Sequence, residues 1–334
     1  MEPARRPAIG DVARSAGVSP QTVSRVLNGS PSVRPATRSR VLAAIETLGY
    51  RPNPAARALA SRRSTSLGVV AVESSLYGPT STLYAVERAA RAAGYGLIVT
   101  SVPAGEPGST PEAVDRLLRQ GVAGAVVIAP LLGTSKALAA LTREVPLVVT
   151  QGRAGKHGTV AVDQVAGAAE VTRHLLEQGE GSCPWHVGGP VDWLEALQRE
   201  KGWQDTVTRA GLVAPPVLRG DWTPSSGYAA AHELVRHDPN VRTVFFANDH
   251  MALGGLRAFQ ELGIRVPQEV LVAGFDDVPE AEFLSPPLTS VAQDFLALGE
   301  SAVRQLVQAL EGAPVPRQKL IAPRLVVRQS TALG

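Results

Sequence analysis

The pattern of apolar and polar positions predicts two short helices near the start of the chain, one ending before Gly17 and one running from Pro20 to about Leu27. Gly17 allows a tight turn between them, and Ser19 is a suitable N-cap for the second. The apolar positions expected to face inward are Val12, Ala13, Ala16, Val23, Val26 and Leu27. Such a pair is either a helix-turn-helix, whose second helix enters the major groove of DNA, or a helical hairpin in an ordinary bundle.

The polar face of the second helix favours the DNA-binding alternative. Gln21 and Arg25 point outward in this pattern, and these residue types can pair with adenine and guanine through two hydrogen bonds each. The residues expected to face DNA from this motif are Pro20, Gln21, Thr22, Ser24, Arg25 and Asn28. We therefore interpret residues 1–51 as a helix-turn-helix headpiece.

Two more helices are predicted before residue 65. The first runs from Pro35 to Leu48, carries an apolar inner stripe and ends at Gly49. After it, Asn53 can cap a short alanine-rich helix over 55–60, which is marginal alone in water. Residues 52–65 are therefore interpreted as a hinge between the headpiece and the rest of the chain.

From residue 66 onward, short apolar runs alternate with helical patterns. The expected strands are LGVVAV, GLIVTSV, GAVVIAP, PLVVTQ and TVAVD, then PWHVGG, TVFFAND and VLVAGFDD. The expected helices lie at about 83–93, 111–120, 135–141, 167–178, 194–210, 225–236, 251–262 and 296–310. This alternation predicts an α/β fold with two doubly wound, Rossmann-like lobes on parallel sheets. The first lobe is expected at about 66–163 and 295–322, and the second at about 164–292 and 323–331.

Charge is distributed unevenly between these parts. Residues 1–65 hold 11 basic and three acidic residues, whereas the remainder holds 22 basic and 27 acidic ones. A basic small domain on an acidic larger one is typical of a DNA-binding headpiece on a ligand-binding body. The single cysteine excludes an intramolecular disulfide, and neither a secretory signal nor a membrane-spanning run is evident, so we expect a cytoplasmic protein.

The carboxyl ends of the strands should supply the polar groups of a cleft between the lobes. On this criterion the candidates are Gln151, Asn248, Asp249, Asp276 and Asp277. Catalysis is not expected, because the sequence has no G-x-S-x-G elbow, no P-loop and no cysteine or histidine set with zinc spacing. We expect neither a cofactor nor a metal.

The motifs VARSAGVSPQTVSRVLN and LGYRPNPAARALA resemble the headpiece of the LacI/GalR family of transcription regulators. The resemblance implies a hinge helix that folds on the operator, pairs with its twin and inserts a leucine into the minor groove, where an apolar wedge kinks a base step. Leu59 matches that leucine, and Asn53 and Ala56 are further expected DNA contacts of the hinge. The chain ends six residues after Arg328, without a tetramerising tail, so we expect a homodimer.

The resemblance continues through the lobes, which are similar to periplasmic sugar-binding proteins. The stretches REKGW, GDW, FANDHMALG, FDD and PPLTSVAQDF match the lactose-repressor branch of the family. The sugar contacts implied residue by residue are Arg199, Trp222 as a stacking platform, Asn248, Asp276 and Gln293, with Phe295 and Leu298 as walls. Gln151 departs from the aspartate of that branch, which leaves the identity of the sugar open. Leu76, Tyr77 and Trp193 are further candidates for the cleft.

These features predict a sequence-specific repressor of a carbohydrate-utilisation operon, released from a pseudo-palindromic operator by a galactoside or other glycoside bound between the lobes. Three alternatives stay open. A corepressor-type regulator would bind DNA more tightly with its ligand, a sugar-binding transport protein would need an export signal and no headpiece, and an enzyme would turn glycosides over.

Overall fold

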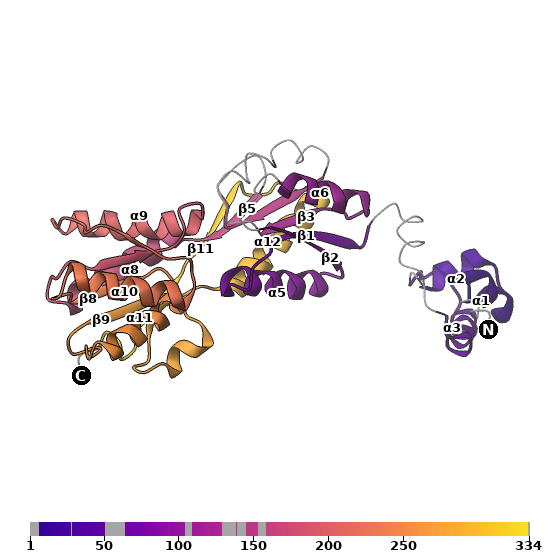
Figure 1. Cartoon of the computed structure of the whole chain (residues 1–334). Helices are drawn as coiled ribbons and strands as arrows, with labels where there is room; N and C mark the ends of the chain where they lie inside the picture. Colours follow the sequence, from indigo (N-terminus) through magenta and orange to yellow (C-terminus); the bar gives the residue numbers. More distant parts are fainter. Residues whose placement is uncertain are drawn as a thin grey trace. The chain divides into compact units, whose positions relative to one another are not determined.

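The computed structural model describes residues 7–27, 29–50, 64–103, 109–128, 138, 145–152 and 158–332 of the 334-residue chain. The chain divides into two compact units, Met1–Thr65 and Ser66–Gly334 (Figure 1). Each unit has a hydrophobic core of its own. None of the helices that the structure describes is long and apolar enough to cross a membrane.

Three helices make up the described part of the first unit: α1 (Ile9–Ala16), α2 (Pro20–Leu27) and α3 (Pro35–Leu48). Their inner faces meet in a core of Val12, Ala13, Ala16, Val23, Val26, Val41 and Ala44. Ile45, Leu48 and Tyr50 are partly buried against this core. The helix-turn-helix pattern is therefore confirmed as a structure, and its third helix has the predicted bounds.

The turn between α1 and α2 forms as the residue types indicate. Gly17 adopts a left-handed conformation with φ of +63°, which a side chain would strain. The next amide, that of Val18, donates to the carbonyl of Ala13 over 3.0 Å and closes the end of α1. At the start of α2, the Ser19 hydroxyl accepts a hydrogen bond from the amide of Thr22 over 3.2 Å. Each cap satisfies a backbone group that the helix itself leaves without a partner.

The first lobe is built on a parallel sheet with strand order β11-β5-β4-β3-β1-β2. Its strands are β1 (Ser66–Val72), β2 (Gly96–Val102), β3 (Ala125–Ile128), β4 (Leu147–Thr150), β5 (Gly158–Val162) and β11 (Gln318–Ile321). Its described part includes the helices α5 (Tyr77–Ala92), α6 (Ser109–Arg119) and α12 (Phe295–Leu310). Val70 and Val127 pack with the side chains of α6, whereas Val69 packs with those of α5 and α12 on the opposite face. Helices thus cover both faces of the sheet (Figure 1).

The second lobe repeats this plan with strand order β12-β10-β9-β8-β6-β7. Its strands are β6 (Trp185–Gly188), β7 (Leu218–Arg219), β8 (Thr243–Phe246), β9 (Leu271–Asp276), β10 (Thr289–Ala292) and β12 (Arg324–Val326). Its helices are α8 (Gln164–Gln178), α9 (Leu194–Arg209), α10 (Pro224–His237), α11 (Asp249–Glu261) and the short 3-10 helix η2 (Pro279–Phe283). Phe245 and Phe275 pack with α8 and α9, whereas Phe246 faces α10 and α11.

The chain passes between the two sheets at three places within its described part. Asp163 joins β5 to α8, Gln293 and Asp294 join β10 to α12, and a short segment at 322–323 joins β11 to β12. Asp163 and Asp294 each cap the helix that follows, accepting amide hydrogen bonds over 2.9 and 2.8 Å. The stretch LTSVAQDF therefore does cross between the lobes, as the sequence indicated.

The fold class predicted from the sequence is confirmed, with three differences in detail. β12 runs antiparallel to β10, so one edge of the second sheet is not parallel. α5 begins at Tyr77 instead of about Leu83, because the stretch GPTST lacks apolar periodicity although its proline suits a first helical turn. The strands β7, β10, β11 and β12 were not predicted, since each is only two to four residues long and mixes polar with apolar residues, so it shows no clear period. The helix expected at 135–141 lies, apart from Leu138, outside the described residues.

Candidate functional site

The second helix of the first unit presents a polar face to solvent. Pro20, Gln21 and Arg25 are exposed, and Thr22 and Ser24 are partly exposed. The opposite face of the same helix carries Val23 and Val26, both buried. This arrangement holds the helix on the unit while leaving its polar face available to a partner, as reading the edges of DNA bases requires. Asn28 of this motif, and Asn53, Ala56 and Leu59 of the hinge, lie outside the described residues.

A second candidate site lies in the larger unit, between its two lobes. One wall comes from the start of α5, and the opposite wall from the second lobe, where Asn248 and Asp276 lie at the carboxyl ends of β8 and β9. The residues that line this cavity, which we call the interlobe cavity, are Leu76, Tyr77, Gly78, Pro79, Trp193, Glu195, Arg199, Trp222, Asn248, Asp276 and Gln293. Most of the residues expected from the resemblance are therefore brought together.

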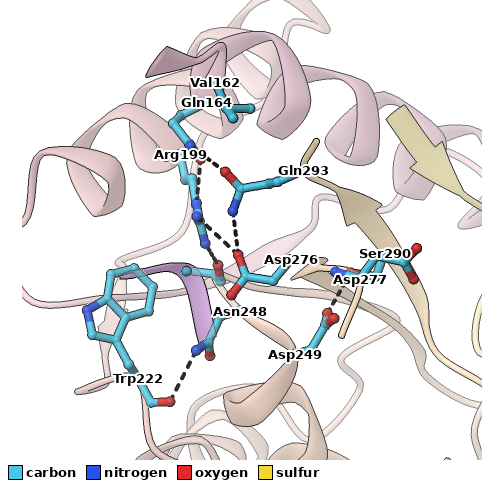
Figure 2. Close-up of polar contacts among 12 residues, drawn as sticks. Val162, Gln164, Arg199, Trp222, Asn248, Asp249, Asp276, Asp277, Ser290 and Gln293 are labelled. Carbon is cyan, nitrogen blue, oxygen red and sulfur yellow. Dashed lines mark hydrogen bonds and ion pairs between the residues drawn. The ribbon is translucent and has the colours of Figure 1, made fainter. Parts of the chain in front are cut away.

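Arg199 is the centre of the polar network in this cavity (Figure 2). Its guanidinium donates to the Asp276 carboxylate over 3.3 Å, to the Gln164 side chain over 2.9 Å and to the carbonyl of Ala247. The guanidinium carbon also lies 3.9 Å from the centre of the Phe275 ring. Arg199 is 3% and Asp276 8% exposed, so this is a buried ion pair that depends on the surrounding hydrogen bonds. Burial raises the pKa of Asp276, and the nearby Arg199 charge opposes that rise.

Two glutamines extend this network to the crossovers between the lobes. Gln293, on the segment between β10 and α12, donates to the Asp276 carboxylate over 2.7 Å. It accepts a hydrogen bond over 2.8 Å from Gln164, the first residue of α8. Figure 2 shows Gln164, Gln293, Arg199 and Asp276 joined in one cluster. Any rotation of one lobe against the other must therefore disturb groups that also line the cavity.

Aromatic rings form another part of the cavity wall. The rings of Trp193 and Trp222 meet edge to face with centroids 5.7 Å apart. Tyr77 meets Phe295 in the same geometry, also at 5.7 Å. The Trp222 backbone is fixed by Asn248, whose side chain donates to the Trp222 carbonyl over 3.1 Å. The indole nitrogen of Trp222 is buried and has no acceptor among the described residues, so it is a donor available for a ligand.

Backbone strain is concentrated near the site. Five non-glycine residues in the described part have positive φ, and they include Gln151 (+58°), Trp222 (+74°), Asp276 (+108°) and Asp277 (+50°). Such conformations persist only where the surrounding structure enforces them, and they are enriched at binding sites. The strands therefore end in turns that direct Asp276 and Trp222 toward the cavity.

Two of the acidic candidates have other partners. Asp249 is buried and accepts hydrogen bonds from the Ser290 hydroxyl over 2.6 Å and from the amide of Val278 over 2.9 Å. Burial raises its pKa well above the ordinary value. Asp277 forms an ion pair with Arg328, whose guanidinium donates a hydrogen bond to the Asp277 carboxylate over 2.7 Å. Neither lines the interlobe cavity. Because Asp249 and Asp277 lie at strand ends, they are neighbours of the site, as the sequence predicted. The local turn geometry nevertheless directs both side chains away from the interlobe cavity.

Gln151, Phe295 and Leu298 also differ from expectation. The side-chain oxygen Oε1 of Gln151 accepts a hydrogen bond from the backbone amide of Val162 over 3.0 Å, and the residue is not among those that line the interlobe cavity. Phe295 lines a wider neighbouring cavity of about 1070 Å³, which shares Tyr77 and Gln293 with the first. Leu298, expected as a wall, is fully buried in the core of the first lobe. Leu298 lies on the inner face of α12, and this position places it in the core and not at the cavity.

The interlobe cavity itself has a volume of only about 20 Å³. That is room for about one water molecule, whereas ligand pockets occupy at least about 300 Å³. A ligand the size of a sugar ring can enter only if the lobes or the aromatic walls move. Among the described residues, no group of three or more histidine, cysteine, aspartate and glutamate side chains could hold a metal ion.

Sequence reasoning missed two residues of this site. Gln164 links Arg199 to Gln293, but a glutamine at a helix start gives no signal of long-range contact. Glu195 lies in the first turn of α9 and is 9% exposed in the cavity. The only signal in the sequence was its position four residues before Arg199, which places both side chains on one face of a helix.

A helix-turn-helix unit joined to a two-lobed body with a polar cavity between the lobes defines a ligand-responsive DNA-binding regulator. Residues 8–53 match the family model described as bacterial regulatory proteins, lacI family, and residues 172–331 match a periplasmic binding protein-like domain.

Known proteins resemble the chain over nearly its whole length. It is 32% identical over 323 residues to the lactose operon repressor of Escherichia coli (strain K12), covering 96% of this chain and 89% of the repressor. It is 34% identical over 345 residues to the HTH-type transcriptional regulator CelR of Thermobifida fusca, and the match covers 99% of this chain and 100% of CelR. A crystal structure of the lac repressor dimer bound to operator and the anti-inducer ONPF superposes with a TM-score of 0.92, at 31% identity over 98% of this chain and 99% of that one. The chain belongs to the lacI family of bacterial regulatory proteins.

Proposed function

We propose that the protein is a repressor of carbohydrate-utilisation genes that binds a pseudo-palindromic operator as a homodimer and is released by a sugar in the interlobe cavity. The relatives support the class: one is a lactose operon repressor, and a CelR structure holds cellobiose, with a TM-score of 0.71 at 30% identity over 97% of this chain and 100% of that one. A DNA-binding regulator acts where the chromosome is, which places its action in the cytoplasm. Catalysis has no part in this proposal.

One observation carries the sugar assignment. The interlobe cavity combines a buried set of carboxylate, guanidinium and amide groups with the indole of Trp222. Planar polar groups of this kind donate to and accept from hydroxyls, and an aromatic face packs against the apolar face of a sugar ring. In this structure Arg199, Asp276 and Gln293 satisfy one another. A sugar would replace these internal hydrogen bonds with bonds to its hydroxyls.

The same network explains how a sugar could act on DNA binding. Gln293 and Gln164 lie at the crossovers between the lobes, so a ligand that alters their hydrogen bonds also alters the relative position of the lobes. The expected DNA contacts of the first unit are Pro20, Gln21, Thr22, Ser24 and Arg25, and the hinge residue Leu59 is proposed from the resemblance alone. The effector contacts we propose are Leu76, Tyr77, Trp193, Arg199, Trp222, Asn248, Asp276 and Gln293.

The test is operator release by sugar in the full-length protein. DNA sites selected from a random pool are bound to the wild type and to Asp276→Asn, and lactose, cellobiose, maltose, D-galactose and D-glucose are titrated while fluorescence anisotropy is followed. We expect at least one sugar to release the wild type and none to release Asp276→Asn, because the variant loses the charged acceptor without changing the first unit.

Two other outcomes would contradict the proposal. Tighter operator binding on addition of sugar would identify a corepressor-type regulator. Turnover of p-nitrophenyl glycosides by the wild type, abolished in Asp276→Asn, would identify an enzyme. A thermal melt of both proteins shows whether Asp276→Asn folds normally.

A further inference from the structure

Glu195 lies in the interlobe cavity, and none of the described residues forms a hydrogen bond or ion pair with its side chain there. It belongs to the first turn of α9, is only 9% exposed, and lines the cavity together with Trp193, Trp222 and Arg199. None of the described residues donates a hydrogen bond to it, and the interactions it experiences are burial and the charges of Arg199 and Asp276. A largely buried carboxyl group to which no protein group donates costs stability, because it loses most of its hydration and gains no protein hydrogen bond in return.

The charges in the cavity do not balance. Two carboxyl groups, those of Glu195 and Asp276, line it, and Arg199 is the one guanidinium among the lining residues. That guanidinium already donates to Asp276, to Gln164 and to the carbonyl of Ala247. The cavity therefore holds one carboxyl group to which none of the described residues donates a hydrogen bond.

Resting on the proposed function, we infer that Glu195 is a specificity-determining residue that accepts a hydrogen bond from a hydroxyl of the sugar effector. Glu195 lines the same cavity as the two indoles and lies on the helix that also carries Arg199, so it places a strong acceptor there that forms no hydrogen bond with the described residues of the Arg199–Asp276–Gln293 network. A hydroxyl group supplies the missing donor without bringing a charge into the cavity.

This role makes sugar binding depend on pH. Burial raises the pKa of Glu195 to about 7, while the charge of Arg199 lowers it and that of Asp276 raises it. Tyr77 lines the same cavity from α5, and His250 on α11 acts on Asp276. Only the ionised carboxylate accepts from the hydroxyl with full strength, so the sugar binds that form preferentially. Affinity should rise by about tenfold from pH 6 to pH 8, and binding should release a proton below pH 7.

The experiment measures sugar affinity of the full-length protein by calorimetry at pH 6 and pH 8. The probes are lactose, cellobiose, maltose, D-galactose and D-glucose, and the proteins are wild type, Glu195→Gln and Asp192→Asn. Asp192 is an exposed acidic residue three positions before Glu195, so its variant removes the same charge outside the cavity. We expect Glu195→Gln to bind about tenfold more weakly than wild type at pH 8 and to show no pH dependence, because a charge-assisted hydrogen bond is lost. Asp192→Asn should match the wild type at both pH values.

The outcomes separate this inference from the function on which it rests. If the wild type binds a sugar and Glu195→Gln binds it equally well at pH 8, or keeps the same pH dependence, the assignment of Glu195 is wrong while the proposed function stands. If none of the five sugars binds the wild type, the proposed function fails and the assignment fails with it. Glu195→Gln is nearly isosteric and removes a buried acid, so its thermal melt should not fall below that of the wild type.

Discussion

At the scale of single residues, the second lobe contains several buried ionisable groups that the fold accommodates in different ways. Arg199 and Asp276 are paired and hydrogen-bonded. Asp249 accepts two hydrogen bonds while burial raises its pKa. His186 is fully buried, with its ring stacked 4.7 Å from that of Phe245. Its Nδ1 lies 3.0 Å from the carbonyl of Phe245, which can only accept, so Nδ1 carries the proton in the neutral ring.

His186 should make the second lobe sensitive to acid. Burial lowers its pKa from 6.5 to about 3, so between these values the unfolded chain binds a proton that the folded chain excludes. The contribution of His186 to the free energy of unfolding is therefore constant above pH 6.5. As the pH decreases from 6.5 toward 3, protonation of the unfolded chain lowers the free energy of unfolding by about 1.4 kcal/mol per pH unit. His186→Asn keeps a donor near the Nδ1 position and should show a weaker loss in urea unfolding between pH 6.5 and 4.5.

The exposed His237 provides the control for this prediction. His237→Asn should unfold with the same pH dependence as the wild type. Equal pH dependence in His186→Asn and the wild type would show that His186 does not contribute to acid sensitivity.

At the scale of elements, the second helix of the first unit combines two requirements in eight residues. Val23 and Val26 anchor α2 in the core, and the Ser19 hydroxyl caps its start. Gln21 and Arg25 occupy the exposed face one turn apart. A short helix of this kind is stabilised by tertiary packing more than by its own propensity, so it presents its polar face in a fixed orientation.

Arg25 is expected to read a base and not only a phosphate. Arg25→Ala should cost roughly 1–3 kcal/mol at one base pair of the selected operator and relax the preference for that base. The measurement is anisotropy of the operator and of its single-base variants with each protein. Arg40→Ala, which removes an exposed arginine from α3, is the matched control and should not change base preference. Equal weakening by Arg25→Ala on every DNA sequence would identify Arg25 as a phosphate contact.

At the scale of the whole molecule, the larger unit consists of two similar lobes whose connections pass beside its cavity. The crossover residue Gln293 bonds to Asp276 in the cavity and to Gln164 at the start of α8. Ligand binding and lobe position are therefore properties of the same hydrogen-bond network. A ligand shifts such an equilibrium only by its difference in affinity for the two arrangements of the lobes.

The proposed coupling must be reciprocal. If sugar in both cavities of the homodimer weakens operator binding by some factor, operator DNA must weaken the binding of the two sugars together by the same factor, which is the product of the factors for the two cavities. The measurement compares the operator dissociation constant with and without saturating sugar, and the sugar dissociation constant with and without saturating operator, at one salt concentration. An operator factor that differs beyond error from the product of the two sugar factors would show that sugar or operator binds at a site outside this scheme.

The helix-turn-helix and the type and order of most strands and helices were predictable from the amino-acid sequence, because they follow from local periodicity and from capping residues such as Gly17 and Ser19. The motifs also indicated Arg199, Trp222, Asn248, Asp276 and Gln293, which the structure brings to one cavity. A short strand such as β7 and the polar first turn of α5 show no periodicity, so the sequence did not predict them.

Which polar residues share the cavity depends on contacts between distant segments of the chain, which the sequence pattern does not show. Gln164 and Gln293 are 129 positions apart, so their hydrogen bond could not follow from local pattern. Asp249, adjacent to Asn248, is held by Ser290 and Val278, partners that the sequence does not place beside it. Glu195 is a candidate sugar contact because packing buries its side chain in the cavity, where none of the described residues donates a hydrogen bond to it. Burial and hydrogen-bond partners arise from contacts between distant segments, whereas periodicity records only the neighbourhood of each residue.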